Sequence, residues 1–191
     1  MTVMARFSGL LALMILLVAC AAAPVPNDRA RIPDLARTIA ALGADVDPAE
    51  AERAAEISIT YSRALQQQYG VTDSALVHNA KVNAGLRPRG LCWHWAQDLE
   101  RRLKQEGFET LDLHRGVANY NNLLIEHSTV LISSKGAAFQ DALVLDPWRK
   151  GGFLIWAPAA NDSHYNWTPR DEVLAFKRAR KSRRNPGHNP E

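Results

Sequence analysis

The chain has 191 residues and a net charge of +3, with 47% hydrophobic and 23% charged residues. Its length is enough for one compact domain with one core. The positive charge is local, because six Lys and Arg residues stand between positions 177 and 184, and subtracting them leaves −3 for the rest of the chain. This distribution excludes a domain that is basic over its whole surface. No aromatic residue interleaves with the basic segment, so we expect no nucleic-acid partner.

Residues 1–19 have the layout of a secretory signal peptide. Arg6 precedes an apolar run from Leu10 to Ala19, and small residues follow the run. The run is well short of the roughly 20 residues that a membrane-spanning helix needs. We therefore expect an exported chain rather than one held by a permanent transmembrane helix.

The end of the apolar run resembles the lipobox of bacterial lipoproteins, in the stretch Leu17-Val18-Ala19-Cys20. The resemblance implies that Cys20 is acylated, becomes the first mature residue and anchors the protein to a membrane surface. It also implies a place in the bacterial cell envelope facing the periplasm, with the outer membrane favoured because position 21 is not Asp. The alternative is ordinary cleavage near residues 21–23, which would leave a soluble exported protein.

Three helices are predicted after a proline-containing tether at residues 20–31. The second helix runs from Pro48 to about Tyr69, with Asp47 as its N-cap and Gly70 after its end. A third, over about 74–84, would be capped by Asp73. The first helix is predicted by apolar residues at helical spacing, namely Ile32, Leu35, Ile39 and Leu42.

A fourth helix begins at Cys92 and ends before Gly107. Beyond it the apolar period changes from 3.6 to 2, which predicts strands at residues 110–114, 123–132, 142–146 and 153–156. Helices followed by strands predict an α+β fold, with N-terminal helices and then an antiparallel β-sheet. We expect one domain over residues 32–176 and a basic disordered tail over 177–191. Contact of that tail with an anionic lipid or polymer is the alternative to a solvated tail.

The middle two strands predict a contact between His127 and Asp146. A hairpin folded about a point between residues 136 and 137 places these two residues directly opposite each other on one side of the sheet. Opposed Cβ atoms lie about 4.5–5.5 Å apart, which suits a carboxylate that accepts from an imidazole N–H. A slip of one residue would put the two side chains on opposite faces.

Cys92, His127 and Asp146 then have the order and setting of a thiol-based acyl-transfer site. At a helix N-terminus, the macrodipole and the unpaired N–H groups favour thiolate over thiol and can receive a developing oxyanion. His127 would deprotonate the thiol and later protonate the leaving group, and Asp146 would orient the imidazole. With Cys20 lipidated, Cys92 has no disulfide partner, because the chain has only two cysteines. The alternative is a structural thiol, a satisfied strand histidine and a turn-starting Asp-Pro.

Other candidates are weaker. Asn79 and Asn83 are possible side-chain oxyanion donors, and Trp93 and Trp148 adjoin the three residues and could wall a substrate cleft. His94 is two residues from Cys92 on the same helix and is therefore a poor base, whereas His114 is an alternative orienting residue. No paired-ligand pattern indicates a zinc site, and we expect no metal or other cofactor.

The ordered set resembles the transglutaminase-like branch of the papain-like cysteine enzymes. Cys92-Trp93 is similar to the active-site dipeptide of papain, and Leu145-Asp146-Pro147 to the Asp-Pro of transglutaminase cores. The similarity covers residues 90–156, and the short spacing between the three residues is nearest to that of bacterial transglutaminase-like cysteine proteinases. No Gln precedes Cys92 at the spacing that papain has, and the residues after His127 lack the aromatic flanks of many transglutaminase cores.

The resemblance implies a papain-like fold and a membrane-anchored thiol hydrolase that cleaves a peptide or isopeptide amide through an acyl-enzyme. Its partners would be a protein or peptide substrate and, through Cys20, a membrane. Two alternatives are acyl transfer to an amine, as in transglutaminases, and a non-catalytic lipoprotein that only binds a partner.

Overall fold

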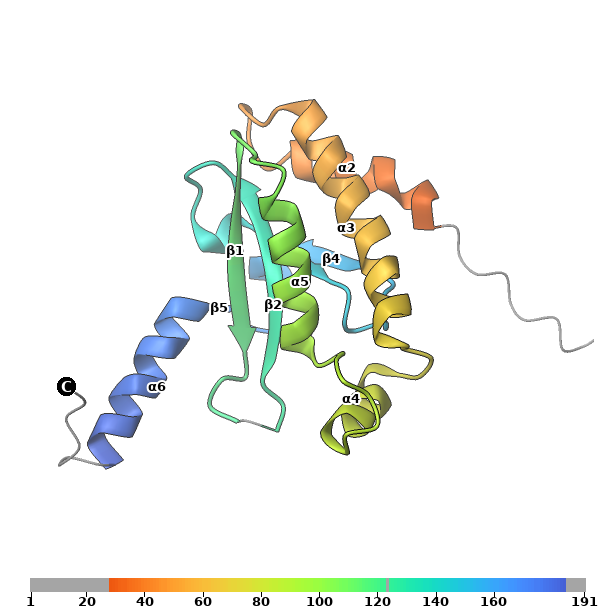
Figure 1. Ribbon diagram of the computed structural model, residues 1–191. Helices are drawn as coiled ribbons and strands as arrows, with labels where there is room; N and C mark the ends of the chain where they lie inside the picture. Colours follow the sequence, from red (N-terminus) through yellow and green to blue (C-terminus); the bar gives the residue numbers. More distant parts are fainter. Residues whose placement is uncertain (1–27, 123, 185–191) are drawn as a thin grey trace, which may run out of the picture.

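A computed structural model describes residues 28–122 and 124–184 (Figure 1). The expected signal peptide, the lipidation site at Cys20 and most of the tether lie outside the described residues. Within them, no helix combines the length and the apolar character needed to cross a bilayer. The fold is α+β, with N-terminal helices followed by an antiparallel sheet, as the sequence predicts.

Four helices precede the sheet: α2 (Ile32–Ala40), α3 (Pro48–Tyr69), α4 (Ala75–Asn83) and α5 (Cys92–Lys104). The bounds predicted for α3 are confirmed, because both of its ends carry local signals. Asp47 accepts a hydrogen bond from the backbone N–H of Ala49, and Gly70 adopts the left-handed conformation with φ of 63°. The predicted cap of α4 is wrong. Ser74 holds the N-cap position, and Asp73 instead pairs with Lys81 at 2.5 Å.

The sheet has five antiparallel strands in the order β4-β3-β2-β1-β5. They span β1 (Leu111–Ala118), β2 (His127–Ser134), β3 (Leu143–Asp146), β4 (Ile155–Pro158) and β5 (Thr168–Pro169). The first four correspond to the predicted strands with shifted ends, whereas β5 was not predicted. Short 3₁₀ turns precede α2, at Asp28–Arg31, and flank the last strands, at Phe139–Asp141 and Ala159–Asn161.

The register of the β2–β3 hairpin differs from the prediction by two residues. Val130 pairs with Leu145, so the position opposite Asp146 is Thr129 and not His127. The 3₁₀ turn at Phe139–Asp141 delays the start of β3, which shifts the midpoint of the hairpin towards the C-terminus. A shift of two keeps each side chain on its face. His127 and Asp146 therefore still share one face of the sheet, as predicted, but lie diagonally.

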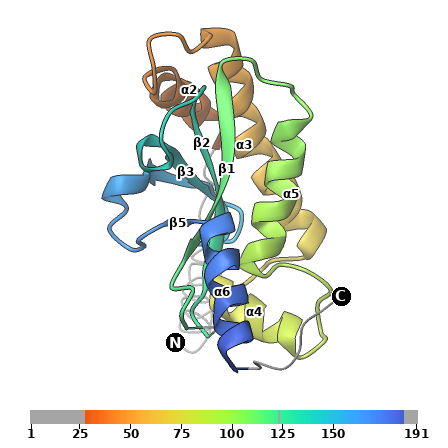
Figure 2. The same cartoon turned by 90° about the vertical axis from the view of Figure 1, so that its left-hand side faces the viewer.

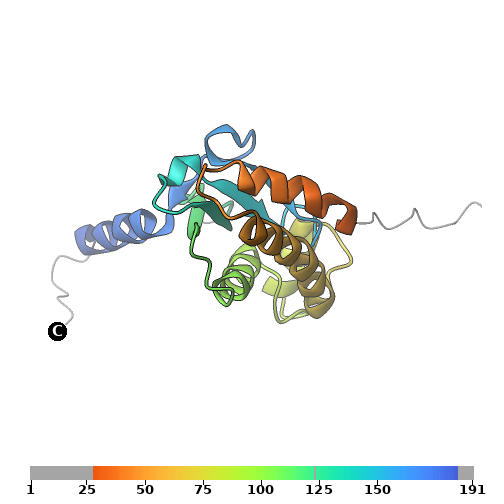
Figure 3. The same ribbon diagram turned by 90° about the horizontal axis from the view of Figure 1, so that it is seen from above.

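The main core lies between the helices and one face of the sheet. Helix α5 packs on β2, α3 covers α5, and α2 packs on α3 (Figures 1 and 3). Period-2 alternation sends Val130 and Ile132 into this core, and Leu131 into a smaller cluster on the other face with Val144. By the same alternation His127 lies on the face that carries Leu131, while α5 covers the opposite one.

Helix α6 (Arg170–Arg184) follows β5 and extends away from the body of the protein (Figures 1 and 3). The expectation of a disordered tail from residue 177 is therefore wrong as far as Arg184, and residues 185–191 lie outside the described part. Contacts from other segments hold the first half of α6: Val173 is buried, Phe176 packs edge-on against Tyr120, and Lys177 pairs with Glu126. The composition of residues 177–184 alone does not predict these contacts with distant segments, and so it does not predict the helix.

Candidate functional site

The first turn of α5 presents Cys92 at the first helical position. The helix start is capped by His94, whose Nδ1 accepts hydrogen bonds from the backbone N–H groups of Gly90 and Leu91, each at 3.1 Å. Burial, assisted by the charge of Arg89, lowers the pKa of His94 and favours the neutral ring that this acceptor role needs. His94 therefore serves as a cap, in agreement with its expected unsuitability as a base.

Gly90 permits this capped turn. Its φ is 126°, and a Cβ at this position would lie 2.3 Å from Nε2 of His78, which donates to the carbonyl of Arg89. Only glycine tolerates both the backbone conformation and the close approach of the imidazole. The glycine thus sets the direction from which the chain enters the Cys92 helix.

The thiol of Cys92 is half-buried and is a free thiol, 3.7 Å from the carbonyl oxygen of Glu126, towards which it donates. Glu126 precedes His127, so this contact fixes the start of α5 against the start of β2. The backbone N–H groups of the first helical turn have no intrahelical acceptor. Those of Cys92 and Trp93 are therefore placed to stabilise negative charge beside the sulfur.

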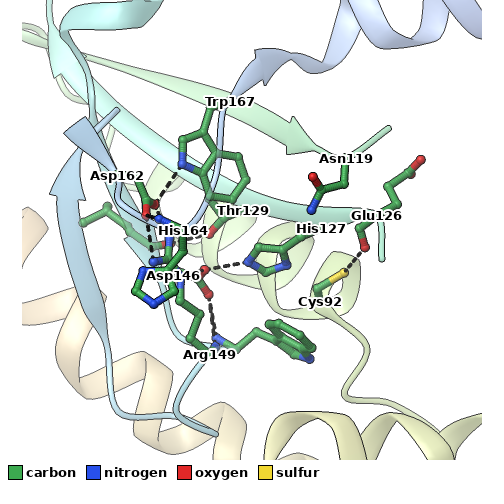
Figure 4. A network of polar contacts seen from close by, with 12 residues as sticks. Cys92, Asn119, Glu126, His127, Thr129, Asp146, Arg149, Asp162, His164 and Trp167 are labelled. Atoms are coloured by element: carbon green, nitrogen blue, oxygen red, sulfur yellow. Dashed lines mark hydrogen bonds and ion pairs between the residues drawn. The ribbon is translucent and has the colours of Figure 1, made fainter. Parts of the chain in front are cut away.

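The imidazole of His127 lies between Cys92 and the carboxylate of Asp146 (Figure 4). Its Nε2–H donates to Oδ2 of Asp146 at 2.6 Å. Its Nδ1 is buried and has no conventional hydrogen-bond partner among the described residues, and the ring side that carries it faces Cys92. The structure thus brings together the three residues that the sequence singled out.

The two buried groups stabilise each other's charge. His127 is 2% exposed and Asp146 is fully buried. Burial alone would lower the pKa of His127, but the Asp146 carboxylate, with a smaller contribution from Cys92, raises that pKa to about 9. Burial opposes ionisation of Asp146 as well, yet the imidazole and the Arg149 guanidinium lower its pKa. The imidazolium form of His127 is therefore favoured at neutral pH.

The turn after β3 holds Asp146 in place. Its Oδ1 accepts from the backbone N–H groups of Trp148 (3.0 Å) and Arg149 (3.3 Å), and Oδ2 accepts from Nε of Arg149 at 2.7 Å. Arg149 also binds both carboxylate oxygens of Asp162, which in turn accepts from the indole N–H of Trp167 at 3.0 Å. A continuous polar network thus runs from His127 to the loop before β5 (Figure 4).

Three aromatic rings surround the imidazole of His127. The ring centroids of Trp148, Tyr165 and Trp167 lie 4.6, 4.7 and 5.4 Å from it. Burial and the neighbouring charge of Asp146 raise the pKa of Tyr165, so its phenol stays neutral. The rings exclude water from the His127–Asp146 pair and leave the Cys92 side as its polar approach.

The other predicted residues divide between the site and its surroundings. Trp148 stacks on His127, and its indole N–H donates to Oδ1 of Asn79 at 3.1 Å, which places Asn79 beside the site. Trp93 is 47% exposed next to Cys92. Asn83 ends α4, is exposed and makes no side-chain hydrogen bond with any described residue. His114 hydrogen-bonds Ser133 and none of the three residues Cys92, His127 and Asp146, which we call the triad, so it is not the orienting residue.

Sequence reasoning missed Arg149, Asp162, Tyr165 and Trp167. Arg149 follows Asp146 by three residues, a spacing at which a turn brings two side chains together, so an ion pair there was a detectable signal. Residues 162–167 have no apolar period and no motif, and only the folded chain places them at the site.

Among residues 28–122 and 124–184, no group of three or more His, Cys, Asp and Glu side chains is arranged to hold a metal ion. No protein-family model, curated protein or solved structure matches this chain.

Proposed function

We propose that this protein is an extracytoplasmic thiol hydrolase that cleaves a peptide or isopeptide amide through an acyl-enzyme. The observation that carries the proposal is the placement of the buried His127 ring between the Cys92 thiol and the Asp146 carboxylate, at the N-terminus of a helix. A structural histidine needs neither a buried carboxylate partner nor a thiol at its second nitrogen. The resemblance to transglutaminase-like cysteine enzymes supports the same reaction class.

The chemistry follows from this geometry. The raised pKa of His127 favours a resting ion pair in which the proton of Cys92 resides on Nδ1 of the imidazole, so that a thiolate faces an imidazolium that the Asp146 carboxylate stabilises. The sulfur attacks the carbonyl carbon, and the new oxyanion faces the N–H groups at the start of α5. The C–N bond then breaks, and His127 protonates the departing amine. Water attacks the thioester while His127 takes its proton, and breaking of the C–S bond releases the acid and restores the thiolate–imidazolium pair.

Alkylation of Cys92 tests the proposal. The mature protein is treated with iodoacetamide at pH 7, and labelling of the peptide that contains Cys92 is followed by mass spectrometry. We expect fast alkylation that His127→Ala slows about tenfold or more, because the thiolate loses its cationic partner. His114→Ala is the matched control, since it removes a strand histidine bonded only to Ser133. Slow labelling of the unaltered protein, or equal effects of both variants, would refute an activated thiol.

The alternatives separate in further assays. Incorporation of a labelled primary amine into a peptide acyl donor would favour transglutaminase-type transfer, which uses the same three residues. An unreactive Cys92 in a folded protein that retains a partner would favour the non-catalytic binding module. The attachment to the envelope is part of the proposal: Cys20→Ser should release the protein from the membrane fraction if lipid anchors it.

A further inference from the structure

A groove of about 320 Å³ is lined by residues of α5, β1 and α6. Figure 2 shows the arrangement of these elements, with α6 in front of β1 and α5 beside them. The groove begins at Trp93, the residue after Cys92, and at Glu126, the residue before His127. Its other principal lining residues are Arg115 on β1 and Arg170, Leu174 and Lys177 on α6. We refer to it as the α5–α6 groove.

The α5–α6 groove combines apolar and cationic surfaces. Trp93 and Leu174 supply apolar contacts, while three cations, Arg115, Arg170 and Lys177, outnumber the single carboxylate of Glu126 in the lining. Lys177 pairs with Glu126, and Arg115 is held by Glu100 at 3.0 Å and by Ser128 at 3.2 Å. The Nε–H of Arg115 is buried without an acceptor, and Arg170 forms no ion pair with any described residue. Because the Nε–H of Arg115 is closed off from solvent, Arg170 is the lining cation that a ligand can bind without displacing a partner among the described residues.

Helix α6 adds to this positive field. It carries seven Lys and Arg residues and two acidic ones, Asp171 and Glu172, a net charge of +5 over 15 residues. The groove also continues past Arg115 and Arg170, because both residues line an adjoining hollow of about 440 Å³, whose other charged lining residues are Lys104, Glu100 and Asp171. The excess of cations belongs to the α5–α6 groove itself, which fits an extended segment with carboxylate side groups better than it fits a compact neutral molecule.

We propose that the α5–α6 groove binds the substrate as an acidic peptide segment, with Arg170 and Arg115 as its carboxylate-recognising residues. This inference rests on the proposed function, because the groove leads away from Cys92. A peptide lying along β1 would place aliphatic side chains against Trp93 and Leu174 and carboxylates against the two guanidinium groups. Arg170, which forms no ion pair with any described residue, has the larger role in specificity.

Binding to a Cys92→Ala protein tests the inference without any turnover. The probe is a fluorescently labelled, end-blocked peptide of alternating Glu and Leu, compared with its Gln-for-Glu counterpart by anisotropy. We expect the Glu peptide to bind at least about tenfold more tightly at low salt, with the difference shrinking as salt screens the charges. Arg170→Gln should weaken binding of the Glu peptide about fivefold. Arg178→Gln is the matched control, because it removes the same charge from an exposed position of α6 that lines neither hollow.

The binding results of the two peptides and the two Arg variants distinguish the groove from other binding sites. Equal affinity for the Glu and Gln peptides, or equal losses in Arg170→Gln and Arg178→Gln, would overturn the groove as the binding site. A protein that binds anionic phospholipid vesicles but neither peptide would also overturn it, by showing that the cations serve a lipid surface. An unreactive Cys92 would refute the hydrolase while these binding results stood, so the two failures are distinguishable.

Discussion

Replacing Asp146 with Asn isolates the charge that this carboxylate supplies to His127. The substitution keeps the shape of the side chain, and Arg149 retains its second partner, Asp162. The 2.6 Å contact between Nε2 of His127 and Oδ2 of Asp146 would then join two neutral groups. Burial, which opposes the imidazolium, would remain.

The expected effect is large. The pKa of His127 is raised to about 9 from an ordinary 6.5, in spite of burial. Each pKa unit corresponds to about 1.4 kcal/mol, so Asp146, with the smaller contribution of Cys92, stabilises the imidazolium by roughly 3 kcal/mol beyond what burial costs. Without the carboxylate, burial should bring the pKa of His127 below 6.5. At pH 7.5 the ring would change from mostly protonated to mostly neutral.

NMR titration of the His127 ring between pH 5 and 10 measures this change directly. Alkylation of Cys92 over the same range reports its consequence, since the thiolate loses its imidazolium partner in Asp146→Asn. Asp141→Asn provides the control, because Asp141 is exposed and forms no ion pair within the described residues. A His127 midpoint that stays within half a pH unit of the unaltered protein would refute the assignment of the raised pKa to Asp146.

Three further predictions concern stability, measured by urea unfolding. The raised pKa of His127 contributes about 3 kcal/mol to the free energy of unfolding, which is fully present below pH 6.5 and is lost as the pH rises through about 9. The free energy of unfolding should therefore fall between pH 7 and 10. A rise over this range would contradict the prediction. Arg149→Met should lower the free energy of unfolding by about 3 kcal/mol, because the buried carboxylates of Asp146 and Asp162 lose the guanidinium that they share. Arg178→Met should change it little. Gly90→Ala should lower the free energy of unfolding by about 2 kcal/mol or more, and Gly85→Ala by only about 1 kcal/mol. Both glycines have a positive φ, but only a Cβ at position 90 would meet a neighbouring side chain, that of His78. Equal losses in the two variants would contradict the proposed clash.

The elements that the sequence predicted best are those with local signals at both ends. Helix α3 has a capping Asp47 with Pro48 after it, and Gly70 at its C-terminus, so no distant contact was needed to place it. Helix α6 was missed because its charged composition is typical of disorder, and its stability depends on Val173 and on the Glu126–Lys177 pair. The burial of Val173 and the pairing of Lys177 with Glu126 depend on the folded chain, so the sequence next to each residue does not predict them.

The closeness of His127 and Asp146 could be predicted because it requires only that both side chains lie on the same face of the sheet. Any register that differs from the predicted one by an even number of residues meets this requirement. The β2–β3 pairing is displaced by two residues from the symmetric hairpin, and direct opposition of His127 and Asp146 is lost. Since side chains alternate with a period of two, an even displacement leaves both groups on one face, and the imidazole spans the diagonal. An odd displacement would have separated them.

The surroundings of the triad explain how Asp146 can serve His127 while it also binds an arginine. A lone guanidinium beside the carboxylate would compete for its lone pairs and repel an imidazolium. Asp162 offsets this effect, because it accepts from Nη1 and Nη2 of Arg149, whereas Asp146 accepts from Nε, and it balances the charge of the guanidinium. The carboxylate of Asp146 thus keeps its stabilising effect on the His127 imidazolium, while Arg149 and two backbone N–H groups fix its direction. We therefore expect Asp162 to act on the proton affinity of His127 through Arg149 and Asp146, although its carboxylate does not touch the ring.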